Sequence, residues 1–228
     1  MTQALAFSPA TPAAVAGSLD DAAIHLWRFR YALSEGRAPF IALIAAYLDL
    51  APEAVELVDA AGGKPRLTDA TLVRIRSSDA RSIEFNWSHS GGFALIALAR
   101  ALPLGVDIER IRVHLRALEI ARRFFGATEA EAIAALDARA RDRAFIALWC
   151  AKEAVLKAQG KGLAFGLARV AFAPSAGGCG WQPLAIDAAL GGTASWQLAG
   201  FEPISGYRGA LAWRGAPRAV HAYVLEAR

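Results

Sequence analysis

The chain has little cysteine and no long hydrophobic run. Its two cysteines, Cys150 and Cys179, form neither a disulfide framework nor a Cys-x-x-Cys metal motif, which indicates a reducing compartment. The longest apolar run, Phe40 to Leu48, is far shorter than the ~20 residues that span a bilayer. No lysine or arginine precedes Arg28 and no long apolar segment follows Met1, so we expect no secretory signal. These absences predict a cytoplasmic protein that has no membrane partner.

The sequence also lacks basic runs and the common nucleotide-binding glycine motifs. Its 25 lysines and arginines against 21 acidic residues give a net charge of +4, but the positive charges are scattered arginines. Neither GxGxxG nor GxxxxGK[ST] occurs, and there is no internal repeat. The positive surplus is compatible with an acidic partner or a phosphate-rich ligand. Because no basic patch supports it, we expect no nucleic-acid partner.

The first hundred residues predict a mixture of helix and strand. Met1 to Ser18 shows no periodicity and is expected to be poorly ordered. A helix is expected from Arg37 to Leu48, and Ser88 to Gly92 is expected to be a loop. We expect Leu104 to Glu109 to form a hairpin with Phe93 to Arg100. Strands are predicted over residues 23–30, 82–87, 93–100 and 104–109.

The second half predicts three helices followed by short strands. Leu115 to Phe125 is amphipathic, and Thr128 to Glu131 resembles a capping box that opens a further helix. The longest helix is expected within Phe145 to Leu163, where Gly160 and Gly162 mark its end, and it is introduced by residues 141–143. Alternating segments over residues 168–173, 195–201, 209–213 and 221–225 predict a small antiparallel sheet. The chain therefore belongs to the α+β class by its pattern. With 55% hydrophobic and 20% charged residues, it is expected to form a packed core.

Charged side chains stand at spacings that place them on shared faces. Asp107 and Glu109 are two residues apart on a predicted strand, so both point to one side. Trp149, Glu153 and Lys157 are each four apart on the predicted long helix and form one stripe. The two neighbouring strand carboxylates fit either a solvated strand edge or a hard cation such as Mg²⁺. The helical pair alone is equally compatible with a surface ion pair.

Short motifs in a fixed order resemble one enzyme family. They are Gly63-Lys64-Pro65, Phe85-Asn86-Trp87-Ser88-His89-Ser90, Gly105-Val106-Asp107-Ile108-Glu109, Arg122-Arg123-Phe124-Phe125, Trp149-Cys150-Ala151-Lys152-Glu153-Ala154, and Lys157 before Gly160-Lys161-Gly162-Leu163. Their order and spacing, from about Arg37 to Phe172, resemble the Sfp-type 4′-phosphopantetheinyl transferases. That family moves the phosphopantetheine arm of coenzyme A onto a serine of a carrier protein and releases adenosine 3′,5′-bisphosphate.

The resemblance implies roles for individual residues. Asp107, Glu109 and Glu153 are expected to hold one Mg²⁺ against the pyrophosphate of coenzyme A. Glu153 is also a candidate base for the incoming serine, and Lys157 is expected to act on the leaving phosphate. The residues expected to contact coenzyme A are Arg37, Lys64, Ser88, His89 and Lys157. Arg116, Arg122 and Arg123 fit either solvated helix charges or contacts to an acidic carrier protein.

The same resemblance implies two similar α+β lobes in one chain, a pseudo-dimer over residues 1–103 and 104–228. Each lobe is expected to have a small antiparallel sheet with packed helices, and the active site is expected at their junction. The protein is expected to be a monomer whose partners are coenzyme A and an acyl or peptidyl carrier protein.

One family feature is nearly absent. A basic segment usually lies between the first strand and the first helix, where it helps to grip the 3′-phosphate of coenzyme A. Here this segment is almost missing, which leaves Arg37, with Arg28 and Arg30, as the basic residues in its place. The competing function is a relative that binds coenzyme A or carrier protein without transfer. A more distant alternative is a nucleic-acid-binding protein that uses the positive surplus.

Overall fold

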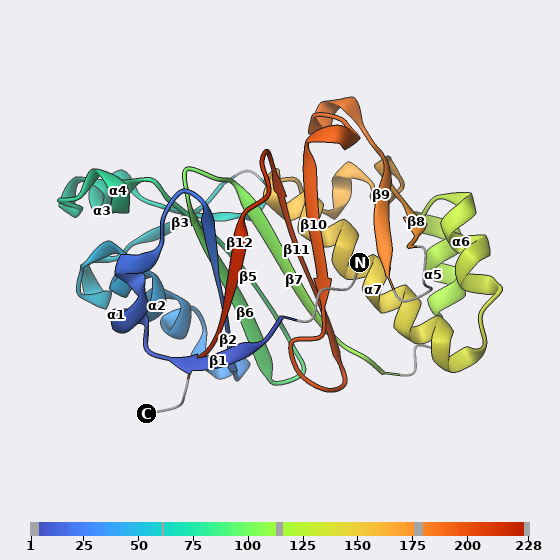
Figure 1. Ribbon diagram of the computed structural model, residues 1–228, viewed down its shortest axis with the longest axis horizontal. Helices are drawn as coiled ribbons and strands as arrows, with labels where there is room; N and C mark the ends of the chain where they lie inside the picture. Colours follow the sequence, from blue (N-terminus) through green and yellow to red (C-terminus); the bar gives the residue numbers. More distant parts are fainter. Residues whose placement is uncertain (1–4, 61, 113–115, 176–179, 226–228) are drawn as a thin grey trace.

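A computed structural model describes residues 5–60, 62–112, 116–175 and 180–225 (Figure 1). Cys179, Leu115 and the first four residues of the chain lie outside these ranges. The described chain is a mixed α+β structure built on two main sheets that lie side by side. The predicted α+β class is therefore confirmed, whereas the division at residue 103 stays a prediction.

The larger sheet has five strands and takes strands from both ends of the chain. In spatial order they are β1 (Phe7–Ala10), β12 (Ala219–Leu225), β2 (Ala23–Arg30), β6 (Phe93–Arg100) and β5 (Ile83–Ser90). Strand β12 runs parallel to both of its neighbours, and the other pairs are antiparallel. The segment predicted over residues 221–225 is thus a strand, but it belongs to this sheet and not to a small antiparallel sheet. A late strand inserted between two early ones leaves no local sequence signal.

The N-terminal segment is ordered where the structure describes it. Phe7 begins β1, and its ring lies 6.3 Å from that of Phe201. Leu19 is buried in the core of the five-stranded sheet. The expected disorder up to Ser18 is therefore wrong for the described residues, because contacts with distant strands hold a segment that has no periodicity of its own.

The smaller sheet has three antiparallel strands: β10 (Trp196–Phe201), β11 (Tyr207–Arg214) and β7 (Leu104–Arg110). The predicted hairpin between β6 and β7 is wrong, since β7 pairs with β11 instead. Between the two strands, Ala101 adopts a left-handed φ of 47°, and Pro103 has no N–H group to donate. The chain therefore leaves the first sheet at this turn and starts the second.

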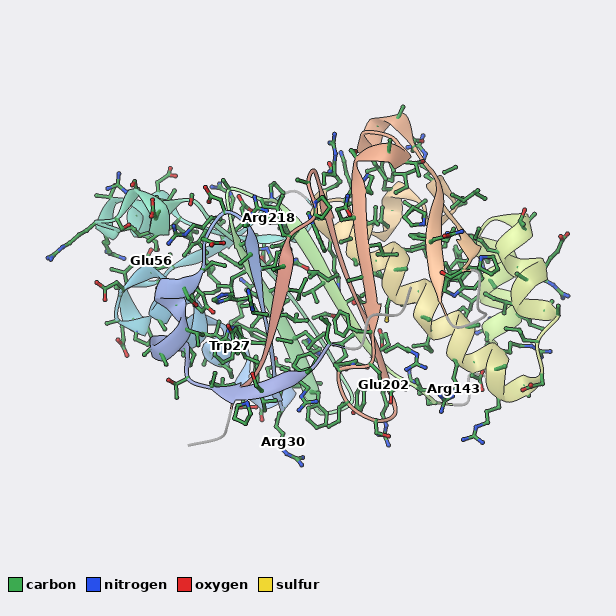
Figure 2. The ribbon with its side chains drawn as sticks, viewed as in Figure 1. Trp27, Arg30, Glu56, Arg143, Glu202 and Arg218 are labelled. Carbon is green, nitrogen blue, oxygen red and sulfur yellow. The ribbon has the colours of Figure 1, made fainter. Side chains whose placement is uncertain are left out.

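Strand β7 is the edge of the smaller sheet, and β5 is the edge of the larger one (Figure 1). The two edges meet, and the side-chain oxygen of Asn86 accepts a hydrogen bond from the Val106 N–H at 2.9 Å. A fully buried apolar cluster that includes Leu95, Val106 and Leu211 spans both sheets. Figure 2 shows side chains filling the space between the ribbons on both sides of this junction.

Two short antiparallel ladders complete the strands. They are β3 (Leu57–Asp59) with β4 (Pro65–Leu67), and β8 (Val170–Pro174) with β9 (Trp181–Ile186). Strand β9 was not predicted, because Pro183 interrupts it and its ladder with β8 contains an irregularity in register.

Helices flank the two sheets on opposite sides of the molecule (Figure 1). They are α1 (Pro12–Val15), α2 (Ala38–Leu48), α3 (Asp69–Arg74), α4 (Ser78–Arg81), α5 (Ala117–Phe124), α6 (Ala127–Ala134) and α7 (Ala138–Ala158). Helices α2, α5 and α6 confirm their predicted segments, although the first turn of α6 is closed by Glu129 accepting from the Gly126 N–H and not by Thr128. Within the described ranges, no helix combines the length and hydrophobicity that crossing a membrane requires.

The long helix α7 begins earlier than the sequence predicts. It starts at Ala138 and not at Phe145, because the side chain of Asp137 caps it by accepting from the Ala140 N–H at 2.9 Å. Its first two turns are rich in arginine and have no apolar period, so periodicity alone misses them. The helix packs along β7 and β11.

A buried histidine lies in the middle of the larger sheet. His25 on β2 is fully buried, and its Nδ1 accepts a hydrogen bond from the Tyr47 hydroxyl at 2.7 Å. Tyr47 in turn accepts from the indole N–H of Trp27 at 2.8 Å. Burial, together with the nearby His221, lowers the pKa of His25 to about 4. The folded protein therefore keeps this ring neutral at pH values where an unfolded chain protonates it.

This pKa predicts a loss of stability in mild acid. The unfolded chain takes up the proton near pH 6.5 and the folded chain only near pH 4, so the lost stability grows between these values as the pH falls. The slope is about 1.4 kcal/mol per pH unit from this one group. Urea unfolding at pH 7 and pH 5 should show this dependence in the wild type and its loss in His25→Gln.

His221→Gln is the matched control, because His221 is the exposed neighbour of His25 on β12. This variant should keep most of the pH dependence. Equal slopes in the wild type and His25→Gln would contradict the assignment to His25.

Candidate functional site

The junction of β5 and β7 carries a row of polar side chains. Asn86, Ser88 and Ser90 alternate along β5 and all reach toward β7. Ser88 Oγ donates to Asp107 Oδ1 at 2.8 Å, and Ser90 Oγ donates to Glu109 Oε2 at 2.7 Å. Strand β5 therefore continues to Ser90. The predicted loop from Ser88 to Gly92 is wrong except for its last two residues, which turn with φ of 54° and 94°.

The two strand carboxylates lie on this junction. Asp107 is 3% exposed, and its Oδ1 also accepts from Lys157 Nζ at 2.6 Å. Burial raises the pKa of Glu109, and the neighbouring Asp107 adds to that rise, while the bond from Ser90 opposes it. The predicted common face of Asp107 and Glu109 is thus the face that meets β5.

Helix α7 is held against β7 with its backbone in contact with the strand. A Cβ atom on Gly105 would lie 2.1 Å from the Ala154 carbonyl oxygen and 2.4 Å from the Ala158 nitrogen. Only glycine allows this approach. This close approach holds the face of α7 that carries Glu153 and Lys157 near the carboxylates of β7.

This environment raises the pKa of both Glu153 and Lys157. Burial raises the pKa of Glu153 to about 7, and the carboxylate of Asp107 adds to the rise. Burial by itself would lower the pKa of Lys157, but the Asp107 carboxylate raises it above its usual value. Lys157 Nζ also donates to Ser88 Oγ at 3.0 Å. The helical pair is therefore not the ordinary surface pair that was the alternative interpretation.

The carboxylates leave room for a cation. Two buried oxygens, Asp107 Oδ2 and Glu153 Oε1, have no hydrogen-bond partner within the described part of the chain. Unpartnered buried carboxylate oxygens are costly unless a positive group meets them. No group of three or more His, Cys, Asp or Glu among the described residues is arranged to hold a metal by itself. Lys157 currently neutralises one side of Asp107, and the free oxygens fit an oxygen-preferring cation such as Mg²⁺.

A cavity of about 240 Å³ opens beside Glu153 and Lys157. Its walls come from the turn before β4, from β5 and from the C-terminal end of α7. The lining residues are Arg37, Gly62, Gly63, Lys64, Pro65, Asn86, Trp87, Glu153, Lys157, Gly160, Lys161 and Gly162. Four of these side chains are cationic and one is acidic, so the cavity favours an anionic ligand.

Three predicted coenzyme contacts, Arg37, Lys64 and Lys157, lie in the cavity wall. Arg37 donates to both oxygens of Asp59 at 2.8 Å, and its guanidinium lies 6.0 Å from the centre of the Trp87 ring. Lys64 donates to the Leu104 carbonyl at 3.2 Å, and burial lowers its pKa. The structure thus brings Arg37, Lys64, Glu153 and Lys157 to one cavity.

The other predicted contacts lie elsewhere. Ser88 points to Asp107 and does not line the cavity. His89 is exposed on the opposite face of β5, where its ring lies 4.9 Å from that of Tyr31. Side chains alternate along a strand, so one face presents Ser88 and the other His89.

Two of the three arginines expected to replace the missing basic segment also lie outside the cavity lining. Arg28 donates to the Pro203 carbonyl and lies 5.0 Å from the ring of Phe7. Arg30 lies 5.4 Å from the ring of Phe93, and Figure 2 shows it at the lower margin of the molecule, extending outward. Only Arg37 of the three lines the cavity.

The sequence interpretation missed several residues of the site. Gly105, Asn86 and Ser90 belong to the motifs, but the local pattern predicts no role for any of them. The period-two spacing of Asn86, Ser88 and Ser90 predicts a shared face on a strand. The prediction of a loop from Ser88 onward interrupts this pattern, so the shared face is missed. Lys161 was also missed as a cavity residue. Trp149 is a packing residue, since its ring lies 6.1 Å from that of Phe145 in the core around α7.

Comparisons with known proteins point to one family. The family model of the 4′-phosphopantetheinyl transferase superfamily matches residues 103–210. A Synechocystis sp. protein provisionally named a 4′-phosphopantetheinyl transferase is 37% identical over 128 residues, which are 56% of this chain and 49% of that protein. The 4′-phosphopantetheinyl transferase HetI of Nostoc sp. is 33% identical over 135 residues, 59% of this chain and 54% of HetI. The 4′-phosphopantetheinyl transferase Sfp of Bacillus subtilis is 39% identical over 89 residues, 39% of this chain and 38% of Sfp. The chain thus spans about half the length of the Synechocystis and Nostoc relatives.

Proposed function

From the match of residues 103–210 to the family model of the 4′-phosphopantetheinyl transferase superfamily, we propose a function for the whole chain. The chain transfers the 4′-phosphopantetheine arm of coenzyme A to a serine of an acyl or peptidyl carrier protein. The observation that carries the proposal is the placement of Asp107, Glu153 and Lys157 together beside a cavity lined by cations. The relatives named above support the class of reaction.

The proposed architecture is the pseudo-dimer of the family. Residues 1–103 and 104–228 correspond to its two lobes, with β12 of the second part returning to the sheet of the first. The protein acts in the cytoplasm as a monomer. The two main sheets, which meet at the edges of β5 and β7 next to the cavity, support a junctional active site.

Asp107, Glu109 and Glu153 would hold one Mg²⁺ in this proposal. The unpartnered oxygens of Asp107 and Glu153 support their assignment as ligands. The hydroxyl of Ser90 keeps Glu109 oriented toward the same junction. When bound, the ion would offset the clustered carboxylates and stabilise negative charge on the phosphoryl oxygens of the pyrophosphate.

The transfer step then uses the side chains of α7. The serine oxygen of the carrier protein attacks the phosphorus that bears the pantetheine arm, and its proton passes to Glu153. The new Ser–O–P bond forms while the bond between this phosphorus and the bridging oxygen breaks. Adenosine 3′,5′-bisphosphate leaves, and Lys157 stabilises its 5′-phosphate. Glu153 lines the cavity, which places its carboxylate beside the expected position of the serine hydroxyl.

The acidic carrier protein would dock near helix α5. Arg122 and Arg123 are exposed on that helix, and the adjoining Phe124 is 45% exposed. Positive charge around an exposed aromatic ring suits a partner that has an acidic surface and a small apolar patch. Arg116 contributes less to this surface, because it pairs with Glu119 on the same helix.

Mass spectrometry of an apo carrier protein tests the proposal. The carrier is incubated with the chain, coenzyme A and Mg²⁺, and the expected result is a mass increase of one phosphopantetheine group on its serine. Omission of coenzyme A or of Mg²⁺ should abolish the increase. Binding of coenzyme A without any mass change would instead support a relative that binds without transfer.

A further inference from the structure

The turn that follows α7 fixes the backbone position of a lysine, Lys161. Gly160 adopts a left-handed φ of 63°, and its N–H donates to the Lys157 carbonyl at 3.1 Å. The N–H of Lys161 donates to the Leu156 carbonyl at 2.9 Å. This pair of bonds is the Schellman motif, in which a glycine ends the helix and reverses the chain. The position of Lys161 relative to the helix is therefore set by backbone hydrogen bonds.

A second glycine–lysine turn faces this one. Gly62 and Gly63 precede Lys64, and both glycines have positive φ, of 90° and 81°. A Cβ atom on Gly62 would lie 2.2 Å from the Gly160 carbonyl oxygen, so the two turns touch through their backbones. Both turns line the same cavity, and each contributes one lysine to its wall.

The cations of the cavity differ in how far they are neutralised. Arg37 pairs with Asp59, and Lys157 pairs with Asp107. Lys64 lies 4.0 Å from a carboxylate oxygen of Glu84. Lys161, by contrast, has no acidic partner within the described part of the chain.

Lys161 is also accessible to a ligand. Its side chain is exposed, and its ammonium lies 5.9 Å from the ring centre of Phe165. A positive charge without an acidic partner in the wall of a cationic cavity attracts an anionic group of the ligand.

We propose that Lys161 binds the isolated phosphate on the ribose of coenzyme A, and that it is the specificity-determining residue for that phosphate. Coenzyme A carries a pyrophosphate and a separate 3′-phosphate. Lys157 and the carboxylates account for the pyrophosphate in the proposed reaction. Of the other cations in the cavity wall, Arg37 pairs with Asp59 and Lys64 lies near Glu84, which leaves Lys161 for the second group. An ammonium–phosphate contact of this kind is charge-assisted and stronger than a neutral hydrogen bond. The inference rests on the proposed function, because it takes coenzyme A as the ligand.

Titration calorimetry with coenzyme A and 3′-dephospho-coenzyme A tests this role without any transfer. The wild type should bind coenzyme A about tenfold more tightly than the dephospho form, as expected for one charge-assisted contact. Lys161→Ala should lose this preference by weakening only the binding of coenzyme A. Lys161→Arg should retain most of the preference, since it keeps the charge.

Arg169→Ala is the matched control. Arg169 packs against the same Phe165 ring at 4.6 Å and is exposed, but it pairs with Asp187 and does not line the cavity. This variant should bind both ligands as the wild type does.

Three outcomes separate this inference from the proposed function. Equal weakening of both ligands in Lys161→Ala, or no change at all, overturns the role of Lys161. Transfer to a carrier protein by a wild type that does not distinguish the two ligands overturns it as well, while the proposed function stands. Selective binding that Lys161→Ala removes supports the role of Lys161, even where mass spectrometry detects no transfer and the proposed function fails.

Discussion

Replacing Asp107 by asparagine is expected to lower the rate of phosphopantetheine transfer by about 10²–10³-fold while the fold is retained. The amide keeps the size of the side chain and an oxygen that accepts from Ser88 and Lys157, whose bonds to Asp107 are 2.8 Å and 2.6 Å long. It removes the negative charge that would hold the cation and balance Lys157. Losses of this size are typical when one electrostatic contact to a transition state is removed. Transfer rates at saturating coenzyme A, measured against Mg²⁺ concentration, check the expectation.

Asp79→Asn is a suitable control, because Asp79 pairs with Arg100 and its side chain is 60% exposed. This variant should transfer at the wild-type rate. A near-normal rate for Asp107→Asn, with an unchanged dependence on Mg²⁺, would show that Asp107 is not a metal ligand.

Gly105→Ala is expected to destabilise the protein by about 3 kcal/mol, at the upper end of the usual cost of overpacking. The added Cβ would lie 2.1 Å from the Ala154 carbonyl oxygen, and this neighbour is backbone that a rotamer change does not relieve. To make room, α7 must move away from β7. That movement separates Glu153 and Lys157 from Asp107, so transfer should fall in the protein that remains folded. Urea unfolding and transfer rates measure the two effects.

The control for this substitution is Gly200→Ala on β10. Gly200 lies on a strand of the same three-stranded sheet, and a Cβ atom there would meet nothing within 4 Å. Its unfolding free energy should change by less than about 0.5 kcal/mol, as for most substitutions without a contact. Similar unfolding midpoints for the two variants would contradict the close approach at Gly105.

Elements with a strong local period were predictable from the sequence. Strand β2 alternates, β6 is a short apolar run, and the apolar part of α7 repeats every three to four residues. The spacing also predicts the shared faces of Asp107 with Glu109 and of Glu153 with Lys157. These are properties of one element at a time, and each depends only on nearby residues.

Features that depend on distant partners were not predictable. The polar end of β5 suggests a loop, because nothing local shows that Ser88 and Ser90 meet the carboxylates of another sheet edge. The same holds for Lys152, whose ammonium is fully buried 2.8 Å from the carboxylate of Glu129 and donates to the carbonyls of Leu167 and Val170. A lysine next to Glu153 in the sequence is expected to be exposed to solvent. The packing of α6 and β8 against α7 buries it instead.

The insertion of β12 between β1 and β2 determines when the chain can fold during synthesis. Strands β1 and β2 leave the ribosome early, but neither can complete its ladder until residues 219–225 have been translated. Before that moment both strands present unpaired backbone edges, which favour aggregation. The larger sheet therefore closes only after residues 219–225 have been translated, and a nascent chain arrested near residue 200 would leave these edges unpaired and open to aggregation.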